Sequence, residues 1–164
     1  MQKVSFPQAR WWNIAVPLIV ALIITADQLS KNLIRSYPVG HVLFEWRFLR
    51  IVHIFNTGAS FGIFQGQNLV LTIAAIVALV ALSCLAVFVY RRYPQYVTIP
   101  NRIAFGLIIG GISGNLIDRI VHSKVTDFLD LTYWPAFNVA DAASVVGAII
   151  AIFSLIMMIR AESK

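Results

Sequence analysis

Two carboxylates in the last third of the chain have a spacing that could support hydrolysis of a peptide bond. Asp127 and Asp141 lie 14 residues apart and bracket a turn around Pro135. Two facing carboxylates can hydrolyse an amide without a metal ion. The ionised one takes a proton from the attacking water, and the protonated one hydrogen-bonds the carbonyl oxygen and later helps to protonate the leaving amine. Such a pair must share one proton, as in aspartic proteases.

The polar residues near this pair also have a structural interpretation. Asn138 and Asp141 flank the start of a predicted helix, where an N-cap and an acidic residue in the first turn are common. Asp118 and Arg119, near the end of another predicted helix, could form a structural ion pair. Polar groups gathered at the rim of a membrane bundle cost stability, however, and therefore indicate a function.

Other catalytic chemistries lack their residues. His41, His53 and His122 are isolated, and no cluster of histidine and cysteine has the spacing of a metal site. The glycines between residues 106 and 114 lie within a hydrophobic span, so they do not form a phosphate-binding loop. The sequence therefore predicts no metal and no cofactor.

The composition indicates an integral membrane protein. Hydrophobic residues make up 59% of the 164 residues and charged residues only 12%, which is too little polar surface to enclose the chain in water. The 13 Lys and Arg give a net charge of +6, but they are scattered among apolar blocks. This pattern argues against a nucleic-acid partner and favours contacts with lipid head groups.

Four apolar stretches are long enough to cross a bilayer. We predict an all-α polytopic membrane protein, a single domain over residues 1–164, with transmembrane helices at about 12–31, 68–90, 103–121 and 139–159. In the third stretch, Gly106, Gly110 and Gly114 line one helical face, where a neighbouring helix can approach closely.

Residues 36–67, between the first two spans, are too polar to cross the bilayer. The β-branched and aromatic residues around Phe48–Phe55 predict short strands that end in a turn at Asn56–Gly58. We expect a small extracytoplasmic β-like segment on the membrane surface, where Arg47 and Arg50 could contact lipid. An ordered amphipathic loop is an equally good interpretation.

Six of the seven acidic residues fall at one common end of the four spans. If the spans alternate in direction, the end of the first and third and the start of the second and fourth meet on one membrane face. That face carries Asp27, Glu45, Asp118, Asp127, Asp130 and Asp141. Acid concentrated at a membrane surface indicates a functional site.

An even number of spans places both termini on one side of the membrane. The basic residues hardly distinguish the sides, with seven on the terminal side and six opposite. These are Lys3, Arg10, Arg91, Arg92, Arg102, Arg160 and Lys164, against Lys31, Arg35, Arg47, Arg50, Arg119 and Lys124. Short loops carry most weight in the positive-inside rule, so the basic loop from Arg91 to Arg102 favours cytoplasmic termini. The acidic face then looks outward.

Five motifs, in order along almost the whole chain, resemble those of the bacterial lipoprotein signal peptidases, the type II signal peptidases. They are Asp27-Gln-Leu-Ser-Lys31, Asn56-Thr-Gly-Ala-Ser-Phe61, Gly114-Asn-Leu-Ile-Asp-Arg119, Val125-Thr-Asp127-Phe and Phe137-Asn-Val-Ala-Asp141. The resemblance implies an aspartyl endopeptidase of the bacterial cytoplasmic membrane. Such an enzyme removes the signal peptide from diacylglyceryl-modified prolipoproteins and cuts just before the lipidated cysteine.

The resemblance also implies roles for individual residues. The family's catalytic aspartates fall on Asp127 and Asp141. Its polar support and substrate-contact positions fall on Asn115, Arg119 and Asn138, and the loop that borders the substrate contains Asn56.

Three further positions match residues for which we expect supporting roles, namely Asp27, Lys31 and Asp118. The expected partners are the lipid-modified prolipoprotein and membrane lipids, and we expect the protein to act as a monomer.

A small ion-coupled transporter or channel subunit is the alternative from another class, because it also places carboxylates in a membrane bundle. Its acidic residues should lie near mid-membrane, whereas those of this chain lie within about two turns of the predicted span ends. We also find no inverted internal repeat. A purely structural membrane protein would leave Asn115, Asp127 and Asp141 without a purpose, so the sequence favours the peptidase.

Overall fold

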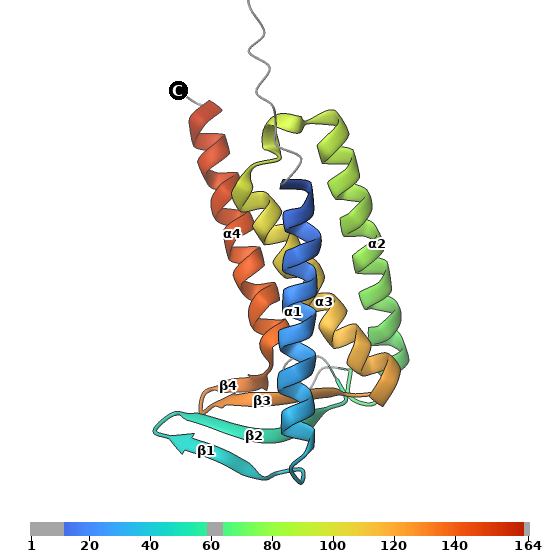
Figure 1. Cartoon of the computed structure of the whole chain (residues 1–164), viewed down its shortest axis with the longest axis vertical. Helices are drawn as coiled ribbons and strands as arrows, with labels where there is room; N and C mark the ends of the chain where they lie inside the picture. Colours follow the sequence, from blue (N-terminus) through green and yellow to red (C-terminus); the bar gives the residue numbers. More distant parts are fainter. Residues whose placement is uncertain (1–11, 59–63, 163–164) are drawn as a thin grey trace, which may run out of the picture.

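Four long helices form an elongated bundle, and a small sheet lies across one end of it (Figure 1). The computed structural model describes residues 12–58 and 64–162. Three residues of the Asn56–Phe61 motif lie outside this part of the chain, as do Lys3, Arg10 and Lys164 among the basic residues considered above.

The helices are α1 (Trp12–Arg35), α2 (Asn68–Arg92), α3 (Ile99–His122) and α4 (Val139–Glu162), and a 3-10 turn, η2 (Pro94–Tyr96), joins α2 to α3. Each long helix has 24 or 25 residues. At a rise of about 1.5 Å per residue, each is long enough to cross a bilayer, and all four are apolar enough to do so. The four predicted spans are confirmed.

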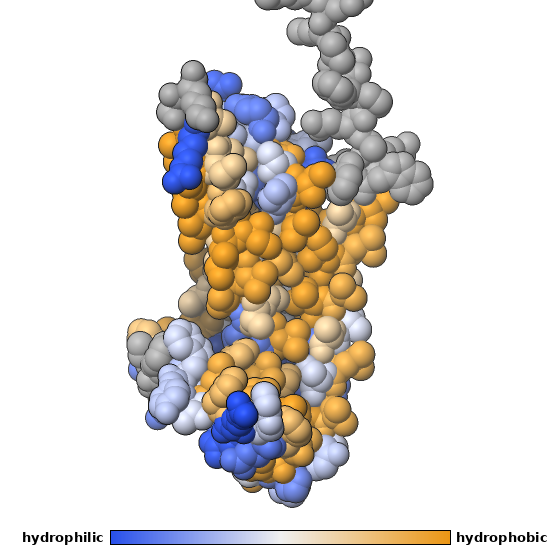
Figure 2. Space-filling model, turned by 90° about the vertical axis from the view of Figure 1, so that its left-hand side faces the viewer, coloured by the Kyte–Doolittle hydropathy of each residue, from blue (hydrophilic) through white to orange (hydrophobic). Residues whose placement is uncertain are grey.

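The surface of the bundle is more apolar than its interior. Large hydrophobic side chains are exposed along all four helices, whereas the largest fully buried side chains are polar or charged. Figure 2 shows a hydrophobic band across the bundle between two hydrophilic ends. Soluble proteins have the opposite distribution. The apolar band therefore matches the hydrocarbon layer of a membrane.

The sheet contains β1 (Val42–Trp46), β2 (Leu49–Asn56), β3 (Val125–Leu131) and β4 (Trp134–Phe137), in the order β1-β2-β3-β4. All neighbouring strands are antiparallel. The strands predicted between the first two spans are therefore confirmed.

The sheet is larger than the sequence predicted, because the region before the fourth span, where we expected only a turn, also forms strands. β3 pairs with β2, a strand from much earlier in the chain, and the register places Asp127 opposite Ile54 and Val125 opposite Asn56. Pairing between distant segments leaves no signal in a local pattern. The pairing of β2 with β3 joins the connection between α1 and α2 to the connection between α3 and α4.

α3 is the central helix and packs against α1, α2 and α4. Gly106 and Gly110 face isoleucines of α1, and a Cβ at either position would lie 2.9 Å from an isoleucine Cβ. Gly114 faces the same helix, and a Cβ there would lie 2.7 Å from Oδ2 of Asp27. The predicted close approach of a neighbouring helix is confirmed, and α1 is that neighbour.

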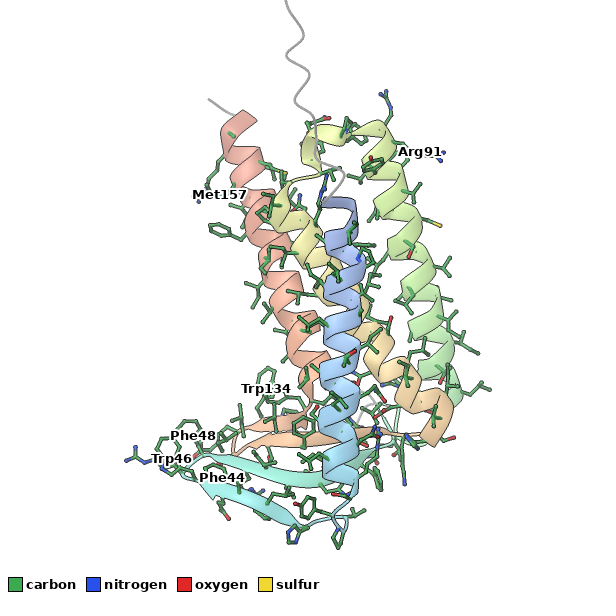
Figure 3. All side chains as sticks on the ribbon, viewed as in Figure 1. Phe44, Trp46, Phe48, Arg91, Trp134 and Met157 are labelled. Atoms are coloured by element: carbon green, nitrogen blue, oxygen red, sulfur yellow. The ribbon has the colours of Figure 1, made fainter. Side chains whose placement is uncertain are left out.

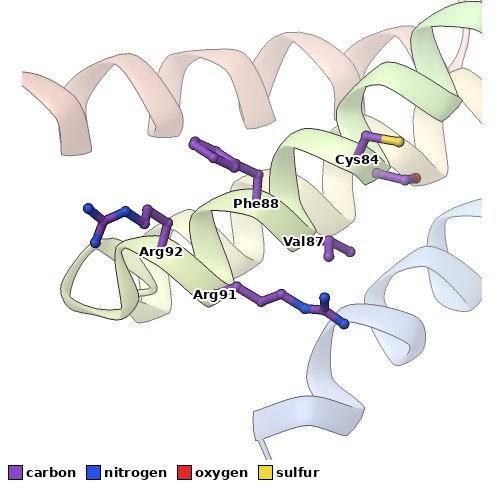
Figure 4. A pocket seen from close by; sticks show the side chains of 6 residues that line it. Cys84, Val87, Phe88, Arg91 and Arg92 are labelled. Carbon is purple, nitrogen blue, oxygen red and sulfur yellow. The ribbon is translucent and has the colours of Figure 1, made fainter.

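α2 lies on the outside of the bundle, and none of its described residues is buried. Its outer surface changes from apolar to basic over the last turns, where Cys84, Val87 and Phe88 are followed by Arg91 and Arg92 (Figure 4). Such a change marks the boundary between the hydrocarbon layer and water. This boundary lies at the end of the bundle opposite the sheet (Figure 3).

Candidate active site

Buried polar side chains gather where the helices meet the sheet, at the end where α1 and α3 finish and α2 and α4 begin (Figure 1). The largest fully buried side chains are Lys31, Asn138, Thr126, Asp27, Asp118 and Asp127. Hydrogen bonds connect these residues to Asn115 and Asp141. Four of the six acidic residues expected on one face are therefore brought into a single cluster.

Asn138, the residue before α4, links the two candidate catalytic carboxylates. Its Nδ2 donates to Oδ1 of Asp127 over 2.7 Å. Its backbone N–H donates to Oδ2 of Asp141 over 3.2 Å, and its Oδ1 accepts from the backbone N–H of Asp141 over 3.0 Å. The last two bonds form a reciprocal capping box. Helix capping is therefore part of the site and not an alternative to it.

Asn115 of α3 holds Asp141 from a second direction. Its Nδ2 donates to Oδ1 of Asp141 over 2.7 Å. Its Oδ1 accepts from Nδ2 of Asn138 over 3.0 Å and from Nζ of Lys31 over 2.9 Å. Because the amide has partners at both ends, its orientation is fixed by the network.

Asp127 lies on β3 and is almost fully buried. Its Oδ2 accepts from Nδ2 of Asn56, at the end of the neighbouring strand, over 3.0 Å. Burial, followed by the negative charge of Asp141, raises the pKa of Asp127 to about 7, although the hydrogen bonds from Asn56 and Asn138 oppose this shift. One carboxyl group of the pair therefore keeps a proton close to neutral pH, as a shared-proton mechanism requires.

α1 contributes a buried ion pair beside the two carboxylates. Nζ of Lys31 lies 2.8 Å from Oδ2 of Asp27, and neither side chain is exposed. Oδ1 of Asp27 accepts from the backbone N–H of Ala140 over 3.0 Å. A carboxylate from α1 thus satisfies a free N–H group in the first turn of α4, at the positive end of the helix dipole.

Asp118 of α3 forms its ion pairs with α1. Its Oδ1 pairs with the guanidinium of Arg35, and its Oδ2 lies 3.5 Å from Nζ of Lys31. Oδ2 also accepts from the backbone N–H of Thr126 over 2.9 Å. The expected Asp118–Arg119 ion pair is therefore wrong, because adjacent residues of a helix point in different directions and Asp118 faces α1.

Arg119 is half-buried and interacts electrostatically with Asp141, Asp127 and Asp118. Its guanidinium forms no ion pair within 4.0 Å in the described part of the chain. The remaining two acidic residues of the predicted face lie on the sheet, where Glu45 is exposed and Asp130 pairs with Arg50.

Sequence reasoning did not single out three residues of this network. Nε2 of Gln28 donates to the carbonyl oxygen of Gly114 over 3.1 Å, and Nε of Arg35 donates to Oγ1 of Thr126 over 2.8 Å. Arg35 could have been found, because it continues the four-residue spacing of Asp27 and Lys31 along one helical face. The contacts of Thr126 depend on the pairing of β3 with β2, which no local pattern of residues indicates.

These parts fit one class of chemistry. Two carboxylates from different elements share Asn138, one of them is protonated near neutral pH, and the guanidinium of Arg119 interacts electrostatically with both. Among residues 12–58 and 64–162, no group of three His, Cys, Asp or Glu side chains is arranged to hold a metal ion. The fold and the candidate site are those of a membrane protease with a two-aspartate centre.

Known proteins agree with this class. The family model for signal peptidase (SPase) II matches residues 19–157. A lipoprotein signal peptidase of Dehalococcoides mccartyi is 45% identical over 127 residues, which cover 77% of this chain and 79% of the relative. The lipoprotein signal peptidase of Moorella thermoacetica is 36% identical, with 85% and 91% covered.

The fold is also found in a solved structure that is described as a bacterial membrane enzyme. The two structures superpose with a TM-score of 0.77 and 31% sequence identity, over 87% of this chain and 88% of the other. The chain belongs to the signal peptidase II family. It is a multi-pass bacterial membrane protein and a protease, and the transporter alternative finds no support.

Proposed function

We propose that the chain removes the signal peptide from diacylglyceryl-modified prolipoproteins by cutting before the lipidated cysteine, with Asp127 and Asp141 as the catalytic pair. The main support is the position of this pair, linked through Asn138 at the end of four spans. A signal peptide is itself a membrane helix, so its scissile bond reaches the depth at which helices end. The relatives named lipoprotein signal peptidase support this substrate.

The reaction uses one carboxylate and one carboxylic acid. The ionised aspartate takes a proton from water as the water oxygen bonds to the carbonyl carbon, and the protonated aspartate hydrogen-bonds the carbonyl oxygen. The amide nitrogen of the tetrahedral intermediate then takes the proton that came from water, and the C–N bond breaks. One water is consumed, and the pair returns to its one-proton state.

The surrounding residues support this reaction in different ways. Asn115 and Asn138 orient the carboxylates through the hydrogen bonds described above. Arg119 places a positive charge near the carbonyl oxygen on which negative charge develops, and such fixed charges stabilise transition states. Asn56 holds Asp127 and lies where β2 leads into the segment that borders the substrate.

The free end of the sheet is suited to contact with lipid. Phe44, Trp46 and Phe48 gather there, and each is about half exposed (Figure 3). The guanidinium carbon of Arg47 lies 5.3 Å from the ring centroid of Trp46. Aromatic and basic side chains placed together are typical of the head-group layer of a membrane. Contact at this level would hold the sheet and the aspartate pair at a fixed depth.

The proposed orientation places both termini in the cytoplasm. The described chain begins and ends at the end of the bundle opposite the sheet (Figure 1). The short connection at that end is flanked by Arg91, Arg92 and Arg102, and basic residues beside short loops favour the cytoplasm. The aspartate pair then lies near the outer face.

The test is cleavage of a lipidated precursor by the purified protein. Asp127→Asn and Asp141→Asn should each abolish cleavage while leaving the variants folded. Glu45→Gln is the matched control, because it neutralises an exposed carboxylate at the same end of the molecule and should cleave normally. Near wild-type cleavage by either aspartate variant would exclude this mechanism.

A further inference from the structure

The described side chains of α1 donate no hydrogen bond directly to the two candidate catalytic carboxylates. α1 nevertheless reaches each carboxylate through one intermediate residue. Lys31 and Arg35 stand one turn apart on the helix and make different connections. Because Lys31 is fully buried, its charge is not screened by water. The two side chains can therefore be compared as two routes from α1 to the site.

The first route leads from Lys31 to Asp141. Nζ of Lys31 donates to Oδ1 of Asn115, and Nδ2 of the same amide donates to Oδ1 of Asp141. A cation at the oxygen end of an amide polarises it and makes its N–H groups better donors. Lys31 therefore strengthens the hydrogen bond that stabilises negative charge on Asp141.

The second route leads from Arg35 to β3. Arg35 binds Asp118 and also donates to Oγ1 of Thr126, and Asp118 accepts the backbone N–H of Thr126. Thr126 precedes Asp127 in the strand. Arg35 and Asp118 thus fix the position of Asp127 through the backbone of Thr126. In the described part of the chain, neither of these charged side chains is hydrogen-bonded to the carboxyl group of Asp127.

The charges around the pair are distributed unevenly. α1 contributes Asp27, Lys31 and Arg35, α3 contributes Asp118 and Arg119, and the pair itself comes from β3 and α4. Asp141 accepts the backbone N–H of Asn138, the residue before α4, and both carboxyl groups interact electrostatically with Arg119. Among the described residues, the donors to Asp127 are the neutral side-chain amides of Asn56 and Asn138, and Asp127 is more deeply buried than Asp141.

We propose that Lys31 is a positioning residue that, through Asn115, keeps Asp141 as the ionised member of the pair and leaves the shared proton on Asp127. Asp141 then takes the proton from the attacking water, and Asp127 donates the hydrogen bond to the substrate carbonyl. This assignment rests on the proposed function.

The test compares the pH profile of kcat/KM for cleavage of a lipidated precursor in three proteins. In Lys31→Gln the charge is lost while an amide remains, so the acidic limb should move to higher pH by about one unit, as for loss of a nearby opposite charge. Arg35→Gln is the matched control. It should lower kcat/KM at all pH values without moving the limb, because Arg35 acts on the backbone of β3.

Lys31→Gln leaves Asp27 without its partner, so a second variant guards against loss of folding. Asp27→Asn combined with Lys31→Gln removes the whole ion pair and should move the acidic limb in the same direction by a smaller amount. The shift is smaller because the double variant also removes the negative charge of Asp27, which acts on Asp141 in the opposite sense. Lys31→Arg, which keeps the charge, should leave the limb in place.

An independent readout locates the proton directly. Infrared spectra of protein labelled with ¹³C-aspartate, recorded at about pH 5, should show a protonated carboxyl band that persists in Asp141→Asn, because burial still raises the pKa of Asp127, and is absent in Asp127→Asn. The reverse pattern would overturn the assignment, as would an acidic limb that stays in place in a folded Lys31→Gln variant. Absence of cleavage by the wild-type protein, or full activity of Asp127→Asn, would instead refute the proposed function.

Discussion

Nδ2 of Asn138 lies 2.7 Å from Oδ1 of Asp127, which joins the residue before α4 to a residue in the middle of the sheet. The same Asn138 caps α4 through its contacts with Asp141. The geometry of the two carboxylates is therefore set by one side chain whose position depends on both a helix end and a strand. Several consequences of this arrangement can be measured.

Replacement of Asn138 should damage activity far more than stability. In Asn138→Ala the helix cap is lost, which costs about 1 kcal/mol, and the link between Asp127 and Asp141 is lost as well. Misplacement of catalytic groups by an ångström costs about 100-fold in rate. We expect kcat to fall by about that factor in cleavage assays, with a small change in melting temperature.

The control for Asn138→Ala is Asn101→Ala, which removes a 2.8 Å side-chain hydrogen bond to the carbonyl oxygen of Tyr96 near the start of α3, at the other end of the bundle. It should leave kcat unchanged. If both variants lowered kcat equally, the effect of Asn138 would reflect general weakening of the bundle.

Activity should fall on the alkaline side of neutrality. Asp127 has its pKa raised to about 7, chiefly by burial, and the one-proton state of the pair is lost when this group ionises. Above that pH, kcat/KM should decrease by about tenfold per pH unit. The profile is measured with a precursor whose own charge does not change in this range. A rate that remained constant to pH 9 would show that the acid in the reaction is not Asp127.

The same pKa makes the stability of the protein depend on pH. An unfolded aspartate has a pKa of about 4, so the folded state, in which the pKa of Asp127 is about 7, binds this proton more tightly. The contribution of Asp127 to stability is therefore fully present below about pH 4 and is lost as the pH rises to about 7. Asp127→Asn should raise the melting temperature at pH 8 by roughly a few degrees.

Asp130→Asn provides the comparison for that measurement, because Asp130 lies on the same strand but pairs with Arg50 on the sheet surface. It should not raise the melting temperature. A lower melting temperature for Asp127→Asn at pH 8 would contradict the assigned direction.

We expect substitution of Gly114 to disrupt the polar cluster and to lower activity. A Cβ in Gly114→Ala would lie 2.7 Å from Oδ2 of Asp27 and would displace the partner of Lys31. In Gly106→Ala the new Cβ would meet an isoleucine at 2.9 Å, which disturbs helix packing without touching the polar cluster. Both variants should be less stable, by about 1–3 kcal/mol. Only Gly114→Ala should also lose most of its kcat.

The aromatic side chains at the free end of the sheet should affect cleavage only when the protein is in a bilayer. Phe44→Ser combined with Phe48→Ser should lower cleavage in proteoliposomes and leave cleavage in detergent unchanged, because the proposed contact is with lipid. Fluorescence of Trp46 should be quenched by lipids brominated near the head group. Tyr37→Ser is the control, because Tyr37 is 38% exposed but lies just after α1, away from the turn between β1 and β2. Equal losses in detergent and bilayer would rule out the lipid contact.

Local patterns in the sequence were sufficient for the helices. Four apolar runs of the right length predict four spans, and the spacing of Gly106, Gly110 and Gly114 predicts a close helix contact, because both depend on residues that are near one another in the chain. The residues of the polar cluster were also largely predictable, since polar groups at span ends are few and costly.

The hydrogen-bond and ion-pair partners of those residues were less predictable from the sequence. Asp118 was expected to pair with its neighbour Arg119 but pairs with Lys31 and Arg35 of α1. The direction of a side chain around a helix is clear from the sequence, but the helix that lies in that direction is not.

The sequence by itself thus determined a four-span membrane protein with two aspartates and their polar companions at one end of the bundle. Only the tertiary structure decided how those companions are connected, because β3 exists through its pairing with β2, and Lys31 reaches Asp141 through an amide of α3. Hydropathy acts along the chain and can be read locally. Hydrogen bonds and ion pairs in a buried cluster depend on distances between segments that are far apart in sequence, and these distances are fixed only when the chain folds.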